Sequence, residues 1–187
     1  MVKADQSVSD VHPRYEKPLT LKNGMQVTLR AIRSDDKQRL RDAFAKLETS
    51  TIYTRFFGYK KQLSDAELVQ ATEIDFHSTV ALLVTTGDGS SETVIGAGRY
   101  VAAPGQMPES AEIAFTVEED FHGLGIASLL LTSLAEIARE NGLKRFEAEV
   151  LPGNAAMLAV FRKSGLAMRQ SLGDGCVHVT LELGPGR

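Results

Sequence analysis

The 187-residue sequence contains a single cysteine, Cys176, and no tryptophan. One cysteine excludes a disulfide within the chain and any metal site built from several thiolates. No apolar run approaches the roughly 20 residues that a membrane-spanning helix needs, and residues 1–18 contain no apolar stretch that could serve as a signal peptide. We therefore expect a cytoplasmic protein that does not enter a membrane.

An excess of charge of one sign is also lacking. The formal net charge is only -3, and no block of five like charges forms an interaction tail, so we expect no nucleic-acid partner. His12, His77 and His178 lack neighbours at metal-ligand spacing, which predicts that no metal is bound. Because 43% of the residues are hydrophobic, the chain can still bury a sizeable core as one domain.

The expected organisation is a flexible N-terminal arm over residues 1–20, followed by a single domain over residues 21–187. The arm is polar, contains Pro13 and Pro18, and shows no hydrophobic periodicity. In the domain, apolar spacing predicts helices over 35–47, 50–57, 125–141 and 154–164, with another helix capped by Ser64. Alternation predicts a strand over 26–32, and further strands are expected over 80–85, 94–101, 112–117, 145–150, 167–171 and 176–183. This order indicates an α/β (α+β) fold with a mixed sheet and helices on both faces.

The most informative segment runs from residue 111 to residue 128. A strand leads into the loop His122-Gly123-Leu124-Gly125, and the loop leads directly into a helix. Glycines let the backbone turn tightly and approach a ligand. The N–H groups of the first helical turn have no partner in the helix, and the helix dipole favours negative charge there. The segment is therefore a candidate pyrophosphate site.

Two familiar phosphate motifs do not fit this segment. A Walker loop requires Gly-Lys-Ser/Thr after its glycines, and that triplet is absent. A dinucleotide fingerprint requires a third glycine where Ser128 stands, and it belongs after the first strand of the fold. Here the motif follows an opening of three predicted helices.

The sequence of residues 122–127, His-Gly-Leu-Gly-Ile-Ala, instead resembles the acetyl-CoA motif of the GNAT superfamily of N-acetyltransferases, Gln/Arg-x-x-Gly-x-Gly/Ala. Downstream, the stretch from Asn154 to Leu166 is similar to the family pattern Asn-x6-Tyr-x3-Gly-Phe, and the helix and strand between the two motifs have the expected lengths. The resemblance spans 26–183. It implies a GNAT fold, in which a sheet of about seven strands is splayed at an acetyl-CoA cleft.

The resemblance also implies the cofactor contacts. Acetyl-CoA would be the cosubstrate, with its pantetheine arm along the strand over 112–117 and its pyrophosphate on the loop amides. The cofactor-binding residues would be Phe115, Thr116, Val117, His122, Gly123, Leu124, Gly125, Ile126, Ala127, Ser128, Asn154 and Phe161. Backbone N–H groups near Phe115 and Val117 would face the oxyanion.

Two positions depart from the family pattern. His122 replaces the usual Gln or Arg, and a histidine is fully charged only part of the time near pH 7. Phe161 replaces the Tyr that protonates the departing thiolate in many relatives, and a phenyl ring has no proton to donate. These departures keep a second hypothesis open, in which the chain is a non-catalytic acyl-CoA-binding sensor module.

The candidate general base is Glu112. An amine must lose a proton before it attacks a thioester, and a carboxylate can accept that proton directly or through water. Alternation places Glu112 with the small residues Ala114 and Thr116 on one strand face. A glutamate at this place often acts as the base in GNAT relatives, although a solvated charge at a strand end is the alternative. Asn154 is either only the N-cap of the following helix or also a ligand of pantetheine or of a catalytic water.

The N-terminal half is similar to the acetyltransferase domains of bacterial protein lysine acetyltransferases, which often read Leu-Arg-x-Ile-Arg and, further on, Ser-x-x-x-x-Arg-Phe-Phe. The acceptor would be a primary amine, on a protein lysine or on a small molecule. Tyr53, Phe56 and Phe57 are expected to pack a helix on the core, whereas Arg55 could pair with a cofactor phosphate or with a surface acid. We expect the last strand, 176–183, to be exposed, so that it could pair across a homodimer.

Overall fold

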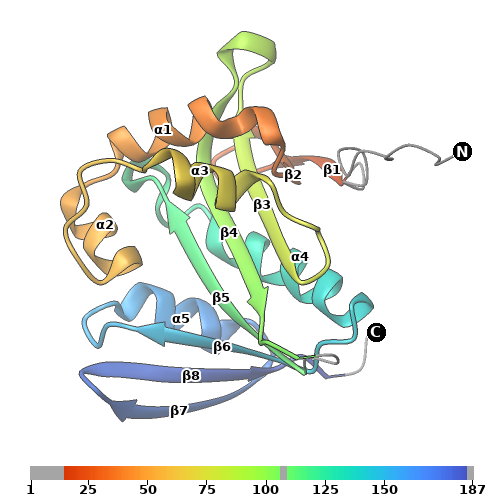
Figure 1. The fold of residues 1–187 in the computed structure, drawn as a ribbon, viewed down its shortest axis with the longest axis vertical. Coiled ribbons are helices and arrows are strands. Elements are labelled where there is room, and N and C mark those ends of the chain that lie inside the picture. The colour runs from red at the N-terminus through yellow and green to blue at the C-terminus, as the bar shows by residue number, and fades with distance from the viewer. Residues whose placement is uncertain (1–14, 106–108, 185–187) are drawn as a thin grey trace, which may run out of the picture.

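The computed structural model describes residues 15–105 and 109–184, which form one mixed sheet with helices on both faces (Figure 1). The eight strands have the order β1-β2-β3-β4-β5-β6-β8-β7, and only β5 and β6 run parallel. The strands are β1 (Glu16–Thr20), β2 (Gln26–Ala31), β3 (Thr79–Thr86), β4 (Thr93–Ala102), β5 (Ser110–Val117), β6 (Arg145–Val150), β7 (Ala167–Gly173) and β8 (Cys176–Glu182). All seven expected strands are present, and the predicted fold class is confirmed.

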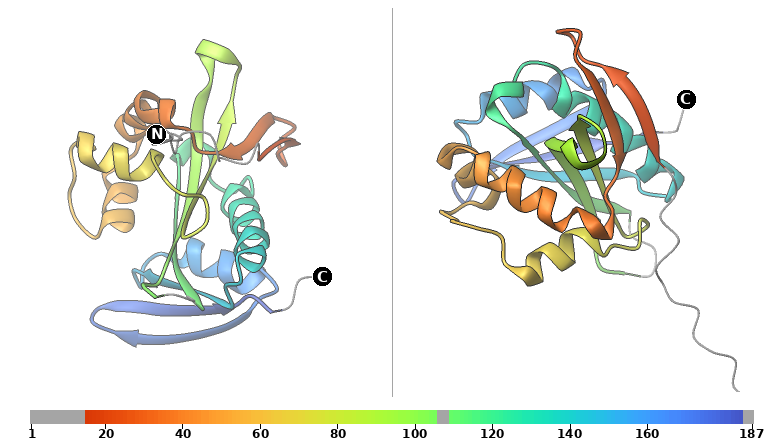
Figure 2. Two further views of the ribbon diagram at one scale, coloured as in Figure 1. Left: turned by 45° about the vertical axis from the view of Figure 1, so that its right-hand side comes forward. Right: turned by 90° about the horizontal axis from the view of Figure 1, so that it is seen from above.

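Five α-helices and three short 3-10 turns connect these strands. The helices are α1 (Lys37–Lys46), α2 (Thr49–Phe56), α3 (Asp65–Thr72), α4 (Ile126–Glu140) and α5 (Ala155–Lys163). Helices α1, α2 and α3 lie on one side of the sheet, and α4 and α5 lie on the other (Figure 2). Ser64 caps α3 as predicted, since its hydroxyl accepts a hydrogen bond from the Glu67 N–H.

One strand, β1, was not expected, and it shortens the flexible arm that the sequence predicted over residues 1–20. Residues 16–20 pair antiparallel with β2, with Glu16 opposite Arg30. Periodicity could not reveal this strand because it lies at the sheet edge and four of its five residues are exposed. Its Pro18 is tolerated there, because an edge strand needs fewer ladder hydrogen bonds. Residues 1–14 lie outside the described part of the chain.

The expectation of an exposed last strand is also wrong. Strand β8 lies between β6 and β7 and pairs with both, so its backbone is covered on each side. The edge in this half of the molecule is β7 (Ala167–Gly173), whose side chains are mostly exposed. A homodimer that extends the sheet at this end would therefore pair through β7.

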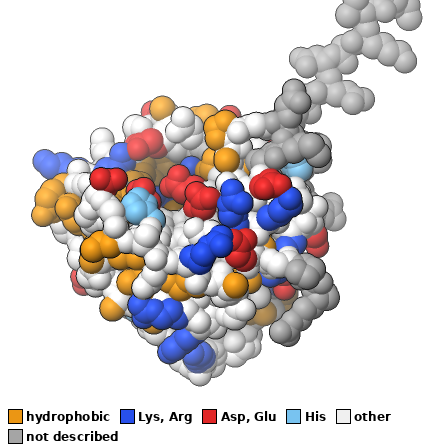
Figure 3. Space-filling view, turned by 90° about the horizontal axis from the view of Figure 1, so that it is seen from below, with side chains coloured by type: hydrophobic (Ala, Val, Ile, Leu, Met, Phe, Trp, Pro, Cys, Tyr) orange, Lys and Arg blue, Asp and Glu red, His pale blue; other side chains and the backbone are white. Residues whose placement is uncertain are grey.

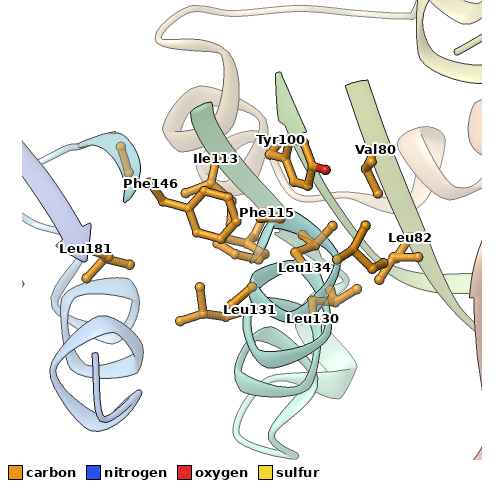
Figure 4. Close-up of a cluster of buried hydrophobic side chains, with 14 of the residues drawn as sticks. Val80, Leu82, Tyr100, Ile113, Phe115, Leu130, Leu131, Leu134, Phe146 and Leu181 are labelled. Atoms are coloured by element: carbon orange, nitrogen blue, oxygen red, sulfur yellow. The ribbon is translucent and has the colours of Figure 1, made fainter. Parts of the chain in front are cut away.

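The main core lies between the sheet and α4. Helix α4 places Leu130, Leu131 and Leu134 against side chains of β3, β4, β5 and β6, including Phe115 and Phe146 (Figure 4). The apolar spacing that predicted this helix is confirmed, because the residues that make the stripe, Ile126, Leu130, Leu134 and Ile137, are all buried.

Two glycines in β4 let α4 approach the sheet closely. A Cβ on Gly96 would lie 2.6 Å from Cγ2 of Ile126, the first residue of α4. A Cβ on Gly98 would meet Phe115, Leu130 and Leu134 at 3.0–3.2 Å. The absence of side chains at these two positions therefore fixes where α4 begins, and with it the position of the candidate pyrophosphate site.

The opposite face carries a smaller cluster under α1 and α3, built on Ile32, Ala81, Leu83 and Val94. Helix α2 packs on β5 chiefly through Ile52. The aromatic residues of this region do not form the predicted core face: Tyr53, Phe56 and Phe57 are 41%, 37% and 43% exposed. They instead form an apolar rim above the sheet.

A buried ion network anchors α1 to the sheet. The Arg30 guanidinium donates two 2.7 Å hydrogen bonds to the Asp36 carboxylate and a third, also 2.7 Å, to Glu92. Arg30 and Asp36 are almost completely buried. Burial disfavours the charged form of Asp36, but the hydrogen bonds from Arg30 and from the Arg33 backbone outweigh it and lower the pKa of Asp36.

In the described part of the chain, no helix is both long and apolar enough to cross a membrane.

Candidate active site

The candidate active site is a cleft between β5 and β6. These parallel strands pair only where 110–112 lie beside 145–147, and Glu112 is opposite Glu147 at the last paired position. Beyond it the two strands separate, and a cleft of about 980 Å³ opens between them. Such a volume suits a ligand larger than most drug-sized molecules. The splayed sheet implied by the resemblance is therefore present.

The glycine loop forms one end of this cleft. Gly123 and Gly125 have φ angles of 76° and 91°, in the left-handed region that favours glycine. Gly125 is the N-cap of α4, and its carbonyl accepts the first helical hydrogen bond from Leu129. The N–H groups of the first turn are left for a ligand. Because Ala127 and Ser128 are small and line the cleft, they leave room for phosphate groups.

His122 lines the cleft but already uses one of its ring nitrogens. Its Nε2 lies 2.9 Å from the Val117 carbonyl oxygen. A carbonyl only accepts hydrogen bonds, so the ring donates its Nε2–H there, and a neutral ring keeps Nδ1 as an acceptor. His122 can therefore donate to a phosphate only in its protonated form.

A lysine that the sequence analysis did not single out supplies positive charge at the same end. Lys22 belongs to the tight turn between β1 and β2. The Leu21 N–H donates to the Met25 carbonyl and the Gly24 N–H donates to the Leu21 carbonyl, which closes the turn. Its side chain lines the cleft, and its Cε lies 3.6 Å from the position of a Cβ on Gly125. No local motif marks Lys22, because it reaches the loop only through the β1–β2 hairpin.

Glu112 lies at the other end of the cleft, where the strands meet. It is exposed and lines the cleft, whereas Ile113 and Phe115 on the opposite strand face are buried against α4. The predicted alternation is confirmed by this burial. Across the cleft, α2 contributes Arg55, whose pKa is lowered by burial and by Arg99 and raised by the charge of Glu112.

The motif that begins at Asn154 lines the cleft on the side of α5. The Asn154 side-chain oxygen accepts a 3.1 Å hydrogen bond from the Met157 N–H, so the N-cap role is confirmed. Phe161 lines the cleft from below but is only 1% exposed, and its ring centre is 6.2 Å from that of Phe115. Phe161 is thus part of an apolar floor.

Most of the predicted cofactor contacts meet in this one cleft. The side chain of Leu124 does not line it and instead packs against the hydrophobic core. The residues that line the cleft as predicted are Glu112, Phe115, Thr116, Val117, His122, Gly123, Gly125, Ile126, Ala127, Ser128, Asn154 and Phe161. Within the described ranges, no group of three His, Cys, Asp or Glu side chains could hold a metal ion.

Charged side chains also cover the outer face of the C-terminal strands, where acidic and basic groups lie side by side (Figure 3). Several form ion pairs: Glu149 with His178 at 3.5 Å, Glu147 with Arg145 at 3.3 Å, and Arg169 with Glu182. Glu147 thus has a charged partner outside the cleft, whereas Glu149 lines the cleft and lies beside a histidine that is charged only when protonated.

Comparison with known proteins identifies the family. The model of the acetyltransferase (GNAT) domain matches residues 26–167. An acetyltransferase of Pseudomonas aeruginosa is 31% identical over 140 residues, which are 74% of this chain and 73% of that protein. The acetyltransferase Pat of Mycolicibacterium smegmatis is 31% identical over 157 residues, covering 83% of this chain but only 46% of that protein.

The fold comparison agrees. The crystal structure of the GNAT domain of S. lividans PAT superposes with a TM-score of 0.82 at 33% identity, covering 89% of this chain and 96% of that one. The resemblance to the acetyltransferase domains of bacterial protein lysine acetyltransferases is thereby confirmed. The chain belongs to the GNAT acetyltransferase family and is an acetyl-CoA-dependent acetyltransferase.

Proposed function

We propose that the chain is an N-acetyltransferase that moves the acetyl group of acetyl-CoA to a primary amine, with Glu112 as the general base and a protein lysine as the acceptor. The position of Glu112 carries this proposal: it is the carboxylate at the point where β5 and β6 separate. The lysine acceptor is supported by the similarity to the Pat proteins. We place the reaction in the cytoplasm, where acetyl-CoA is available.

The residues of the cleft fit acetyl-CoA. The open N–H groups at the start of α4, the loop from Gly123 to Gly125 and the ammonium of Lys22 would hold the pyrophosphate. The pantetheine arm would lie along β5, whose edge beyond Glu112 pairs with no described strand. Asn154 uses its side-chain oxygen as the N-cap, so its amide N–H remains for the pantetheine or a catalytic water.

The reaction would need two contributions from the chain. Glu112 accepts a proton from the acceptor ammonium, whose reference pKa of about 10.4 leaves few free amines at neutral pH. The amine nitrogen then bonds to the thioester carbon, the C–S bond breaks, and CoA leaves as a thiolate. Backbone N–H groups near Phe115 and Val117 would stabilise the negative charge that develops on the carbonyl oxygen. The nitrogen loses its second proton as the amide forms, and because Phe161 has no proton to give, water would pass this proton to the departing thiolate.

Replacing Lys22 by Ala tests the proposed phosphate site. We expect acetyl-CoA to bind about five- to tenfold more weakly, since one charge-assisted contact at an exposed site is lost. The difference between variant and wild type should shrink as salt rises, because salt screens exposed charges. The measurement is a calorimetric titration with acetyl-CoA at low and high ionic strength.

Lys17→Ala is the matched control, because Lys17 belongs to the same hairpin but pairs with Glu136 outside the cleft. Equal affinity for wild type and Lys22→Ala would show that Lys22 does not contact the cofactor.

The acceptor class can be tested by measuring release of free CoA thiol. Purified protein and acetyl-CoA would be incubated with lysine peptides, polyamines, free amino acids and aminoglycosides. The proposal expects turnover that is highest on lysine peptides. Tight acetyl-CoA binding without turnover on any acceptor would contradict the proposal and favour the sensor hypothesis.

A further inference from the structure

The acceptor side of the cleft holds an excess of positive charge next to Glu112. Arg55 lies at the C-terminal end of α2 and lines the cleft from that helix. Its guanidinium lies 5.1 Å from the centre of the Phe56 ring, which is a cation–π contact. That contact covers one face of the guanidinium, and within residues 15–105 and 109–184 no side chain or backbone group accepts a hydrogen bond from it.

Arg99 provides a second guanidinium near that of Arg55. Arg99 of β4 is opposite Ala114 in the register of β4 and β5, so it projects from the same face of the sheet as Glu112. Arg99 is half-buried, and its charge acts on Arg55. Among the described residues, no carboxylate lies within 4.0 Å of either guanidinium, although Glu112 is close enough to influence Arg55.

Neither guanidinium is paired with a carboxylate of the described chain. Glu112 and Glu149 both line the cleft but form no ion pair with Arg55 or Arg99, and Glu147 pairs with Arg145 outside it. Removing a guanidinium from water without an anionic partner is unfavourable. A planar guanidinium binds a carboxylate with two parallel hydrogen bonds, so a carboxylate from outside the chain would complete the arrangement.

The phosphates of CoA do not fit this position. The proposed pyrophosphate site begins after Val117, and five strand residues separate it from Glu112, or roughly 16 Å at about 3.3 Å per residue. Arg55 lines the cleft from α2, which packs on β5, and the charges that act on it come from Glu112 and from Arg99, which is opposite Ala114. These neighbours belong to the transfer end of the cleft. The group that reaches Arg55 belongs to the acceptor.

We propose that the acceptor carries a carboxylate close to its reacting amine, and that Arg55 binds this carboxylate while the amine reaches Glu112. This inference rests on the proposed N-acetyltransferase function and names its substrate class more narrowly. The carboxylate has two chemical sources, an acidic side chain next to an acceptor lysine or the α-carboxylate of a free amino acid. In either case Arg55 is a specificity-determining residue.

Matched acceptors with and without the carboxylate test the proposal. One pair is N-acetyl-Glu-Lys-amide and N-acetyl-Gln-Lys-amide, and the other is free lysine and lysinamide. We expect kcat/KM to be about 10- to 100-fold higher for the carboxylate member of one pair, the range for a hydrogen bond between charged groups. The pair that shows the preference identifies the source of the carboxylate.

Variants then assign the preference to Arg55. Arg55→Gln should bring the ratio within the preferred pair close to one, and Arg55→Lys, which keeps the charge, should retain part of it. Acetyl-CoA affinity should not change in either variant. Arg41→Gln is the control, because Arg41 pairs with Asp65 away from the cleft, and it should keep the full ratio.

The possible failures are distinguishable. Turnover with equal kcat/KM within both pairs would overturn the carboxylate proposal alone, as would a preference that survives in Arg55→Gln. A loss of acetyl-CoA affinity in Arg55→Gln would assign Arg55 to the cofactor instead. If no amine is acetylated although acetyl-CoA binds, both this inference and the proposed function fail.

Discussion

Replacing Glu112 by Gln should lower kcat/KM by about 10²- to 10⁴-fold, the usual contribution of a positioned general base. The amide keeps the size of the side chain but cannot accept the ammonium proton. Acetyl-CoA affinity should be unchanged, because Glu112 lies at the end of the cleft far from the glycine loop. The measurement is steady-state thiol release with a lysine acceptor, alongside a titration with acetyl-CoA.

Glu147→Gln provides the matched control. Glu147 is opposite Glu112 on β6, is also exposed, and does not line the cleft. Its removal should change kcat/KM by less than about twofold, since a solvated charge outside the site contributes little. If both variants lose rate equally, the effect comes from the general charge of this surface and Glu112 is not the base.

Replacing Arg30 by Met should lower the free energy of unfolding by about 3–5 kcal/mol, the cost of removing one partner from a buried ion pair. The variant leaves Asp36 completely buried without its guanidinium, and Glu92 loses its 2.7 Å hydrogen bond. The loss concerns the site as well, because this network joins β2 to the start of α1. Urea unfolding at neutral pH measures the effect.

Arg33→Met is the control for this prediction. Arg33 is three residues further along the chain and forms an ion pair with Glu16, in which both side chains are about half exposed. An exposed pair contributes less than about 1 kcal/mol. Equal destabilisation by the two substitutions would show that the Arg30 network has no special role.

The same network predicts how stability depends on pH. The pKa values of Asp36 and Glu92 lie below their ordinary values of 3.8 and 4.5, because hydrogen bonds from Arg30 outweigh the effect of burial. The folded state thus binds fewer protons than the unfolded state, and the stability that these groups add is present above the unfolded pKa. Wild type should lose this part as pH falls below the ordinary values.

Arg30→Met should show the opposite slope over the same interval. Asp36 and Glu92 then keep Arg39 as their remaining cationic partner, at 3.3 Å and 3.1 Å. Burial now weighs more heavily against their charged forms, so acid should relieve part of the variant's instability. Parallel pH profiles of unfolding for wild type and variant would contradict this explanation.

Much of the fold follows from the sequence because the main core is periodic. The stripe of α4 and the continuous apolar run of β3 are patterns typical of a buried helix face and of a buried strand. Strand β1 has no such pattern because its side chains face solvent, and it is held by the backbone of β2. The exposure of Tyr53 and Phe57 was missed for a related reason, since helical spacing does not reveal whether a helix face meets the sheet.

The sequence likewise reveals only some residues of the candidate site. The glycine loop and Asn154 are local, since each depends on a strand, a turn and a helix that are consecutive in the sequence. Lys22 and Arg99 reach the site through strand pairing between distant segments. No spacing rule joins Lys22 to Gly125 or Arg99 to Glu112, so only the folded chain brings these charges together.

The most direct test of the central claim is mass spectrometry of a lysine peptide after incubation with acetyl-CoA and the protein, with released CoA quantified in the same sample. The account predicts one acetyl group on the lysine amine for each CoA released, and at least about a hundredfold less of both products with Glu112→Gln at equal cofactor binding. Bound acetyl-CoA that yields no acetylated amine, or a Glu112→Gln variant as fast as wild type, would contradict it.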